Sequence, residues 1–227
     1  MKTPFNLNQF LAVFKNYNET IFPLQIVFNL AAIFIIYFAF KPNHLSGRII
    51  SGVISFLWLW MGIVYHIIFF TSINKAAFLF GALFILQGIL FLFFGVFNNR
   101  YSFEFNKDKF GIVGICLMLF ALVIYPLLGY TLGHQYPSSP TFGLPCPTTI
   151  FTFGLLLINS KKVPNTIFII PIIWSVIGSI AVFQFGMIED IGLIIGCLIA
   201  YTLSQKRNKI FIKNEKDIDY QWAPKCR

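Results

Sequence analysis

Long apolar runs separated by short polar stretches dominate the chain. Seven such runs cover approximately residues 21–40, 49–70, 76–97, 110–130, 142–158, 164–184 and 187–204. A helix of about 20 apolar residues crosses a bilayer, so the pattern predicts an all-α membrane protein built as a seven-transmembrane-helix bundle. The connections are short, which places consecutive helices side by side and antiparallel.

The first residues follow a different pattern, in which apolar side chains recur at helical spacing among polar ones. They are Leu7, Phe10, Leu11, Phe14 and Tyr17. We expect residues 3–18 to form an amphipathic helix that lies flat in the membrane interface, capped by Thr3 with Pro4 in its first turn. This segment lacks the continuous apolar core of a signal peptide. The chain then divides into an interfacial segment (1–20), a transmembrane domain (21–204) and a basic tail (205–227).

Composition supports a membrane location. The chain is 57% hydrophobic and 11% charged, whereas a soluble domain is about 45–50% apolar and about 25% charged. The net charge of +9 is spread between the apolar runs and the tail, so we expect the lipid bilayer, and not nucleic acid, as the partner. The four cysteines form no CxxC pair, which indicates neither a disulfide framework nor a zinc module.

The positive charges also predict the orientation. Seven helices put Lys2, Lys15 and Lys75 on one side of the membrane and the rest of the 17 Lys and Arg residues on the other. Positively charged loops favour the cytoplasm. We therefore expect the N-terminus outside and the C-terminus inside, with the chain in the inner (plasma) membrane.

Polar side chains enter the outer halves of the predicted helices. They include Gln25, Asn29, His66, Glu189 and Asp190. Such groups are costly in a membrane and usually face the bundle interior or a wet cavity. Together with Cys146 and Thr148 they are our candidate substrate-binding residues around an outward-facing polar pocket. The alternative is that they only hydrogen-bond neighbouring helices, and that the two acidic residues stabilise the start of the last helix through its dipole.

The fifth run is interrupted by prolines. A helix hardly continues through Pro145 and Pro147, so we expect residues 137–147 to be non-helical and the helix to start at 146–149. That helix is too short to cross the bilayer, and the fifth span is therefore partly non-helical, with irregular chain that lines a cavity. Its positive N-terminal end would face anionic groups or ions. Cys146 at this end is either a reactive thiol, open to reagents from outside, or an inert buried cysteine.

Three stretches of the chain carry a resemblance. They are Trp58–His66, Ile73–Ala77 followed by Phe80 and Gly81, and Phe142–Thr149, which reads Phe-Gly-Leu-Pro-Cys-Pro-Thr-Thr. Together they resemble an uncharacterised family of bacterial polytopic integral membrane proteins, known only as a domain of unknown function. The resemblance covers most of residues 5–204 and implies a bacterial membrane protein. It carries over no reaction, substrate or functional residue.

Three functions compete. The first is a small-solute or ion transporter or binding protein that uses the outward pocket. The second is an accessory membrane protein in which the polar residues only pack. The third is a thiol-dependent membrane enzyme with Cys146 as nucleophile, His66 or His134 as base and an acidic residue to orient it, and it is less favoured because no catalytic motif supports it. We expect no cofactor, and a soft-metal site of Cys146, His66 and a carboxylate stays open.

Overall fold

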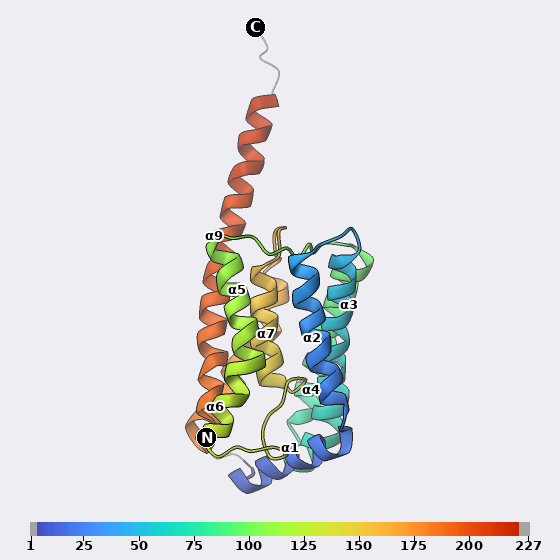
Figure 1. Cartoon of the computed structure of the whole chain (residues 1–227), viewed down its shortest axis with the longest axis vertical. Coiled ribbons are helices and arrows are strands. Elements are labelled where there is room, and N and C mark those ends of the chain that lie inside the picture. The colour runs from blue at the N-terminus through green and yellow to red at the C-terminus, as the bar shows by residue number, and fades with distance from the viewer. Residues whose placement is uncertain (1–3, 223–227) are drawn as a thin grey trace.

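The computed structural model describes residues 4–222, with side chains up to residue 213. Every regular element in this part of the chain is a helix. The helices form a bundle with one helix lying across one end and another projecting from the opposite end (Figure 1). We call the crossed end the α1 end.

All seven predicted apolar runs are helical. The elements are α1 (Leu7–Ile21), α2 (Leu24–Phe40), α3 (Ser46–Trp60), η1 (Met61–Phe69), η2 (Phe70–Ser72), α4 (Ala77–Phe91), η3 (Leu92–Phe97), α5 (Lys109–Leu119), η4 (Phe120–Ile124), α6 (Tyr125–Thr131), α7 (Pro145–Leu157), α8 (Thr166–Phe185), η5 (Ile188–Asp190) and α9 (Ile191–Trp222). The segments η1, η3 and η4 are π-helical and continue the α-helices before them.

Five stretches of the described chain are long and apolar enough to cross a membrane. They are Ser46–Ser72, Ala77–Phe97, Lys109–Thr131, Thr166–Phe185 and Ile188–Lys213. Large apolar side chains cover their outer faces, among them Leu79, Val176, Phe183 and Leu198. An outer surface of this kind is expected next to lipid tails. The chain is therefore an all-helical membrane protein with five candidate spans.

The N-terminal helix starts later than the sequence predicted. It begins at Leu7 and ends at Ile21, and not at residues 3 and 18. Asn6 is the N-cap, because its side chain and that of Gln9 hydrogen-bond to each other's backbone N–H in a capping box. Thr3, the predicted cap, lies outside the described residues. Helices α1 and α2 meet at an angle of 85°, which lays α1 across the end of the bundle (Figure 1).

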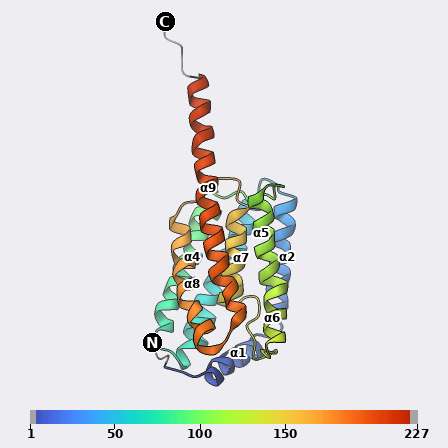
Figure 2. The same ribbon diagram turned by 90° about the vertical axis from the view of Figure 1, so that its left-hand side faces the viewer.

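Helix α7 is the central element of the bundle. It has 13 residues, and all of them except Cys146 are buried. It packs against α5, α8 and α9 (Figure 2). Trp58 Nε1 donates to Thr152 Oγ1 at 3.1 Å from the α3 side, and the Arg207 guanidinium of α9 donates to the Leu157 carbonyl at its C-terminal end. A positive charge at that end also stabilises the helix dipole.

The start of α7 corrects the predicted boundary. The helix begins at Pro145, with Pro147 two residues further on and Leu144 as its N-cap. Residues 145–147, which we predicted to be non-helical, therefore form the first helical turn. Proline is tolerated there because the first turn needs no N–H donors. The connection before it, residues 132–144, is irregular as expected.

The last helix is longer than predicted. It continues to Trp222 and projects beyond the bundle (Figure 1), whereas the apolar run ends near residue 204. No Gly or Pro occurs between Gly196 and Pro224, so nothing in the sequence stops the helix where hydrophobicity falls. At its start, Gly186 has φ 70°, and this left-handed turn reverses the chain after α8.

Candidate functional site

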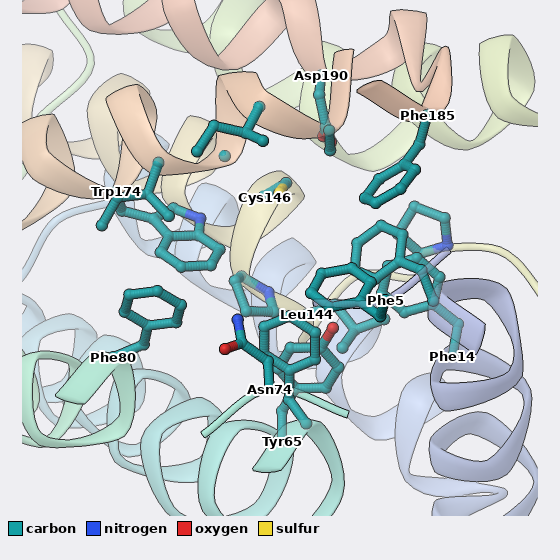
Figure 3. Close-up of a pocket in the computed structure, with 18 of the residues that line it drawn as sticks. Phe5, Phe14, Tyr65, Asn74, Phe80, Leu144, Cys146, Trp174, Phe185 and Asp190 are labelled. Carbon is teal, nitrogen blue, oxygen red and sulfur yellow. The ribbon is translucent and has the colours of Figure 1, made fainter. Parts of the chain in front are cut away.

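A cavity of about 120 Å³ lies at the α1 end of the bundle, among α1, η1, η2, α4, α7, α8 and η5. Nine of its 19 lining residues are aromatic, and several of these rings surround it in Figure 3. The rings belong to Phe5, Phe10, Phe14, Tyr65, Phe70, Phe80, Tyr125, Trp174 and Phe185. The sequence predicted a polar pocket, and the wall is instead apolar with a small polar centre.

The rings contributed by α1 and by Phe5, which precedes it, close one side of the cavity. Phe5 lies with its centroid 5.6 Å from that of Phe70 and 5.4 Å from that of Phe185. Phe10 lies 5.3 Å from Phe185 in a stacked arrangement. Ring pairs at these separations attract each other beyond simple burial. The amphipathic helix therefore supplies part of the site, and its apolar face does not only face lipid.

The polar centre of the cavity is Asp190. Its carboxylate is 2% exposed and accepts a hydrogen bond of 2.6 Å from Tyr125 Oη. The Cys146 thiol lies within hydrogen-bonding reach of the same carboxylate (Figure 3). Among the described residues, no Lys, Arg or His forms an ion pair with Asp190. A buried carboxylate without a positive partner is costly, and this marks the centre as the unusual part of the site.

Trp174 adds a second polar atom, whose neighbour is the Cys146 thiol. Its indole Nε1 is buried and makes no hydrogen bond of acceptable geometry. It faces the side of the cavity where Cys146 lies (Figure 3). Buried indole N–H groups usually find an acceptor, so this donor and the Asp190 carboxylate both offer unused capacity to a bound molecule.

The N-terminus of α7 is a poorer anion site than predicted. An anion there is normally held by the free N–H groups of the first helical turn. Pro145 and Pro147 have no N–H, which leaves that of Cys146 as the one donor among the first three helical residues. The nearby Asp190 carboxylate also opposes a negative ligand. The geometry therefore disfavours the anionic ligand that we expected from a broken helix.

Glu189 lies beside Asp190 in sequence but has a different environment. Its Oε1 is 2.8 Å from His134 Nδ1, and its Oε2 has no hydrogen-bond partner. It lines a separate lateral groove between α5, η4 and α9 and does not line the cavity. Consecutive residues of a 3₁₀ turn point about 120° apart, which explains why the two carboxylates face different spaces.

His66 stands behind the cavity wall. It is fully buried and lies 5.1 Å from the Trp174 ring and 4.6 Å from Phe84, centroid to centroid. Neither ring nitrogen has a hydrogen-bond partner. The prediction that His66 and Cys146 line one cavity is therefore wrong. Trp174 lines the cavity, and His66 packs behind Trp174.

Gln25, Asn29 and Thr148 serve the packing of the site. Gln25 Nε2 donates to the Asn18 carbonyl at 2.6 Å, and Asn29 Nδ2 donates to the Gln25 carbonyl at 2.8 Å. Thr148 Oγ1 accepts from the Gly143 N–H at 3.1 Å, which fixes the chain just before α7. None of the three lines the cavity.

Asn18 is a residue that the sequence reasoning missed. It is fully buried, and its Nδ2 donates to the carbonyls of Pro137 and Ser139 at 2.7 and 2.8 Å. Its Oδ1 accepts from Thr141 Oγ1 at 2.9 Å. Asn18 thereby ties α1 to the connection that leads into α7 (Figure 1). Its position on the apolar face of an amphipathic helix, one residue after Tyr17, was the available signal.

The chemistry of the described residues gives no metal centre. No group of three or more His, Cys, Asp or Glu side chains among them is arranged to hold an ion. Nor does His66 or His134 hydrogen-bond to Cys146, because His134 pairs with Glu189 and His66 has no partner. The nucleophile, base and orienting group required for a thiol enzyme are thus not brought together.

Fold and site define an all-helical membrane protein with an aromatic cavity around one buried carboxylate. The chain belongs to a family of unknown function (DUF6064), whose model matches residues 7–214. No curated protein and no solved structure matches the chain.

Proposed function

We propose that this protein is a seven-span transporter or solute-binding protein of the bacterial inner membrane, which takes a small solute into the cavity at the α1 end. In this proposal Cys146 and Asp190 contact the solute. Gln25, Asn29, His66, Thr148 and Glu189 support the surrounding helices. The observation that carries the proposal is a buried carboxylate without a positive partner inside a cavity.

Two further spans complete the proposed topology. One is α2, which has 17 residues and is bent away from α1. The other is α7, whose 13 residues reach about 20 Å at 1.5 Å per residue, with the irregular connection 132–144 filling the remaining depth. Such chain is tolerated at membrane depth when it is buried in protein. Seven crossings agree with the positions of α1 and of the projecting α9 at opposite ends (Figure 1).

The distribution of positive charge supports the proposed orientation. Lys15 and Lys75 lie at the α1 end, whereas the connections at the other end and α9 carry most of the Lys and Arg residues. The positive-inside rule places the α1 end, and with it the cavity, outside the cytoplasm. We divide the chain accordingly into an interfacial segment (1–20), a transmembrane domain (21–204) and a cytoplasmic basic tail (205–227).

Access to Cys146 from the two sides of the membrane tests this function. A membrane-impermeant maleimide is applied to right-side-out and to inverted vesicles, and mass spectrometry of the peptide containing Cys146 measures the labelling. We expect labelling in right-side-out vesicles, because the cavity opens on that side. Labelling in both vesicle types would show that Cys146 is reached from both sides of the membrane, which is the alternating access that transport requires. No labelling in right-side-out vesicles, while an exposed Asn16→Cys control reacts, overturns the proposal.

The second candidate is an accessory membrane protein without a solute. The observation in its favour is that the side chains of Gln25, Asn29 and Thr148 all form hydrogen bonds with neighbouring backbone groups. It accounts for Asp190 only if the buried carboxyl group is protonated, because a buried group of this kind either pairs with a positive charge or becomes neutral. The labelling experiment separates the two, since a packed structural core does not admit the reagent.

A further inference from the structure

We propose that the cavity binds a small organic cation, a quaternary ammonium or protonated amine, with Asp190 as its counter-charge. The inference rests on the proposed function and adds the chemical class of the solute. It follows from the charge, the wall and the size of the cavity.

The one acidic side chain that lines the cavity, Asp190, has no positive partner among the described residues. The groups that face Asp190 are the Tyr125 hydroxyl from α6, the Cys146 thiol from α7 and the neighbouring Glu189 carboxylate. Among the described residues, the basic side chain beside this acidic pair is His134, which contacts Glu189 and not Asp190. A neutral apolar solute would leave Asp190 buried without a partner, and an anion would be repelled. A cation satisfies the carboxylate.

The wall selects an organic cation over an inorganic one. Aromatic ring faces attract a cation within about 6 Å of the ring centroid, most strongly when water is excluded. Tyr65, Phe70, Phe80 and Trp174 line the cavity next to the rings of α1. A small metal ion instead needs about six oxygen ligands. Four cavity-lining side chains offer oxygen, those of Tyr65, Asn74, Tyr125 and Asp190, and only the last is a carboxylate, which is too few.

The size of the cavity limits the ligand to a small group. Its volume is about 120 Å³, and an engineered apolar cavity of about 150 Å³ in another protein holds benzene. A trimethylammonium group is of similar size to benzene. The site therefore fits a cationic head group of this size, such as that of choline, and the buried Trp174 Nε1 is a donor beside it.

Two thiol reagents of opposite charge test the inference on the native chain. Trimethylammonioethyl methanethiosulfonate is a quaternary ammonium, and its sulfonatoethyl counterpart is an anion of similar size. In each reaction the Cys146 thiolate attacks the reagent sulfur that carries the charged ethyl group. A disulfide forms between the two sulfurs, and methanesulfinate is released. We compare the two labelling rates at Cys146 in right-side-out vesicles, each divided by the rate at an Asn16→Cys control on the exposed face of α1. We expect the normalised ratio to favour the cation by about tenfold or more, equivalent to at least one charge interaction of 1.4 kcal/mol.

Matched carboxylate variants identify the source of the preference. Asp190→Asn keeps an oxygen that accepts the Tyr125 hydrogen bond but removes the charge, so the ratio should fall close to one. Glu189→Gln removes the adjacent charge that faces away from the cavity and should leave most of the preference. Equal normalised rates for both reagents in the native chain overturn the cation inference but keep an accessible cavity. Absence of reaction with both reagents overturns the proposed function itself.

Protection by a free ligand gives a test that needs no variant. Choline at millimolar concentration should slow labelling of Cys146 by a neutral maleimide, whereas its uncharged isostere, with a tert-butyl group in place of the trimethylammonium, should need about tenfold more for the same effect. Equal protection by both compounds contradicts the inference and identifies an apolar site. Protection by neither, in a cavity that the maleimide does label, also contradicts it.

Discussion

Single polar side chains in this bundle differ in whether their hydrogen-bonding capacity is used inside the protein. Asn18 uses its amide fully, on two carbonyls and one hydroxyl, and therefore holds structure together. Asp190 uses one oxygen on Tyr125 and keeps a charge that no described side chain neutralises. The distinction cannot be made from residue type, because both are small polar groups within apolar surroundings.

Removal of the Asn18 side chain should loosen the connection that leads into α7. Asn18→Ala leaves the carbonyls of Pro137 and Ser139 and the Thr141 hydroxyl without their partner, at a cost of about 1–3 kcal/mol in the free energy of unfolding. Thermal unfolding in detergent micelles measures the loss. Asn16→Ala, on the exposed face of the same helix, is the control and should change little. Equal stability of the two variants would refute the role of Asn18 as a tie.

At the scale of elements, the positions of α1 and α7 in the bundle do not follow from the amphipathicity of α1 or the length of α7 alone. Helix α1 meets α2 at 85° and contributes rings to the cavity wall. Helix α7 is short and nearly fully buried, so it has the environment of a core helix and not of a lipid-facing span. Both effects bring segments that are far apart in the sequence to the same cavity.

The close approach of α5 to α7 depends on a pair of glycines. A Cβ atom at Gly114 would lie 2.7 Å from the Gly154 carbonyl oxygen and 2.6 Å from the Ile158 side chain. Gly114→Ala should therefore push the helices apart and lower the free energy of unfolding by about 1–3 kcal/mol. Thermal unfolding of the purified protein measures the change.

Gly52→Ala is the matched control for this prediction. The nearest atom to its Cβ would be a Val96 methyl carbon at 3.8 Å, which is ordinary contact. Alanine is also the better helix former by about 1 kcal/mol, so this variant should be neutral or slightly more stable. Similar destabilisation by both substitutions would show that glycine at position 114 is not needed for helix packing.

At the scale of the whole molecule, the two ends of the bundle differ in charge and in construction. The α1 end has few basic residues, the cavity and the chain reversal at Gly186. The opposite end has the paired connections around Asn159, which accepts from the Ser102 N–H at 2.7 Å, and the basic start of the projecting part of α9. The difference is what a protein that faces two aqueous compartments is expected to show.

Reporter fusions test the orientation of the whole chain. Paired reporters, one active only in the cytoplasm and one active only outside it, are placed after Lys75, after Arg100 and after Arg227. We expect the external reporter to be active at Lys75 and the cytoplasmic reporter to be active at the other two positions, because positively charged segments are retained inside. Activity of the external reporter at Arg227 would reverse or disprove the seven-span topology.

The sequence by itself determined the helical membrane architecture. The apolar runs give the positions of the helices, since burial in lipid or protein requires apolar side chains over the length of each span, although α9 continues to Trp222, beyond the end of its run. The prolines around Cys146 predicted the irregular connection and the short α7, although the helix starts one to four residues earlier than predicted. These features depend on local sequence, because hydrophobicity and the missing N–H of proline act at the positions where those residues stand.

The composition of the site was decided by tertiary structure alone. The cavity joins Phe5, Tyr65, Cys146, Trp174 and Asp190, which lie on five segments far apart in the chain. Phenylalanines for which the sequence indicated no site role form much of its wall, whereas His66 and Glu189, which were predicted to line it, lie outside it. The sequence marks which residues are polar, but the direction in which each side chain points relative to other helices is set by helix rotation and packing, and these depend on all the contacts of the bundle together.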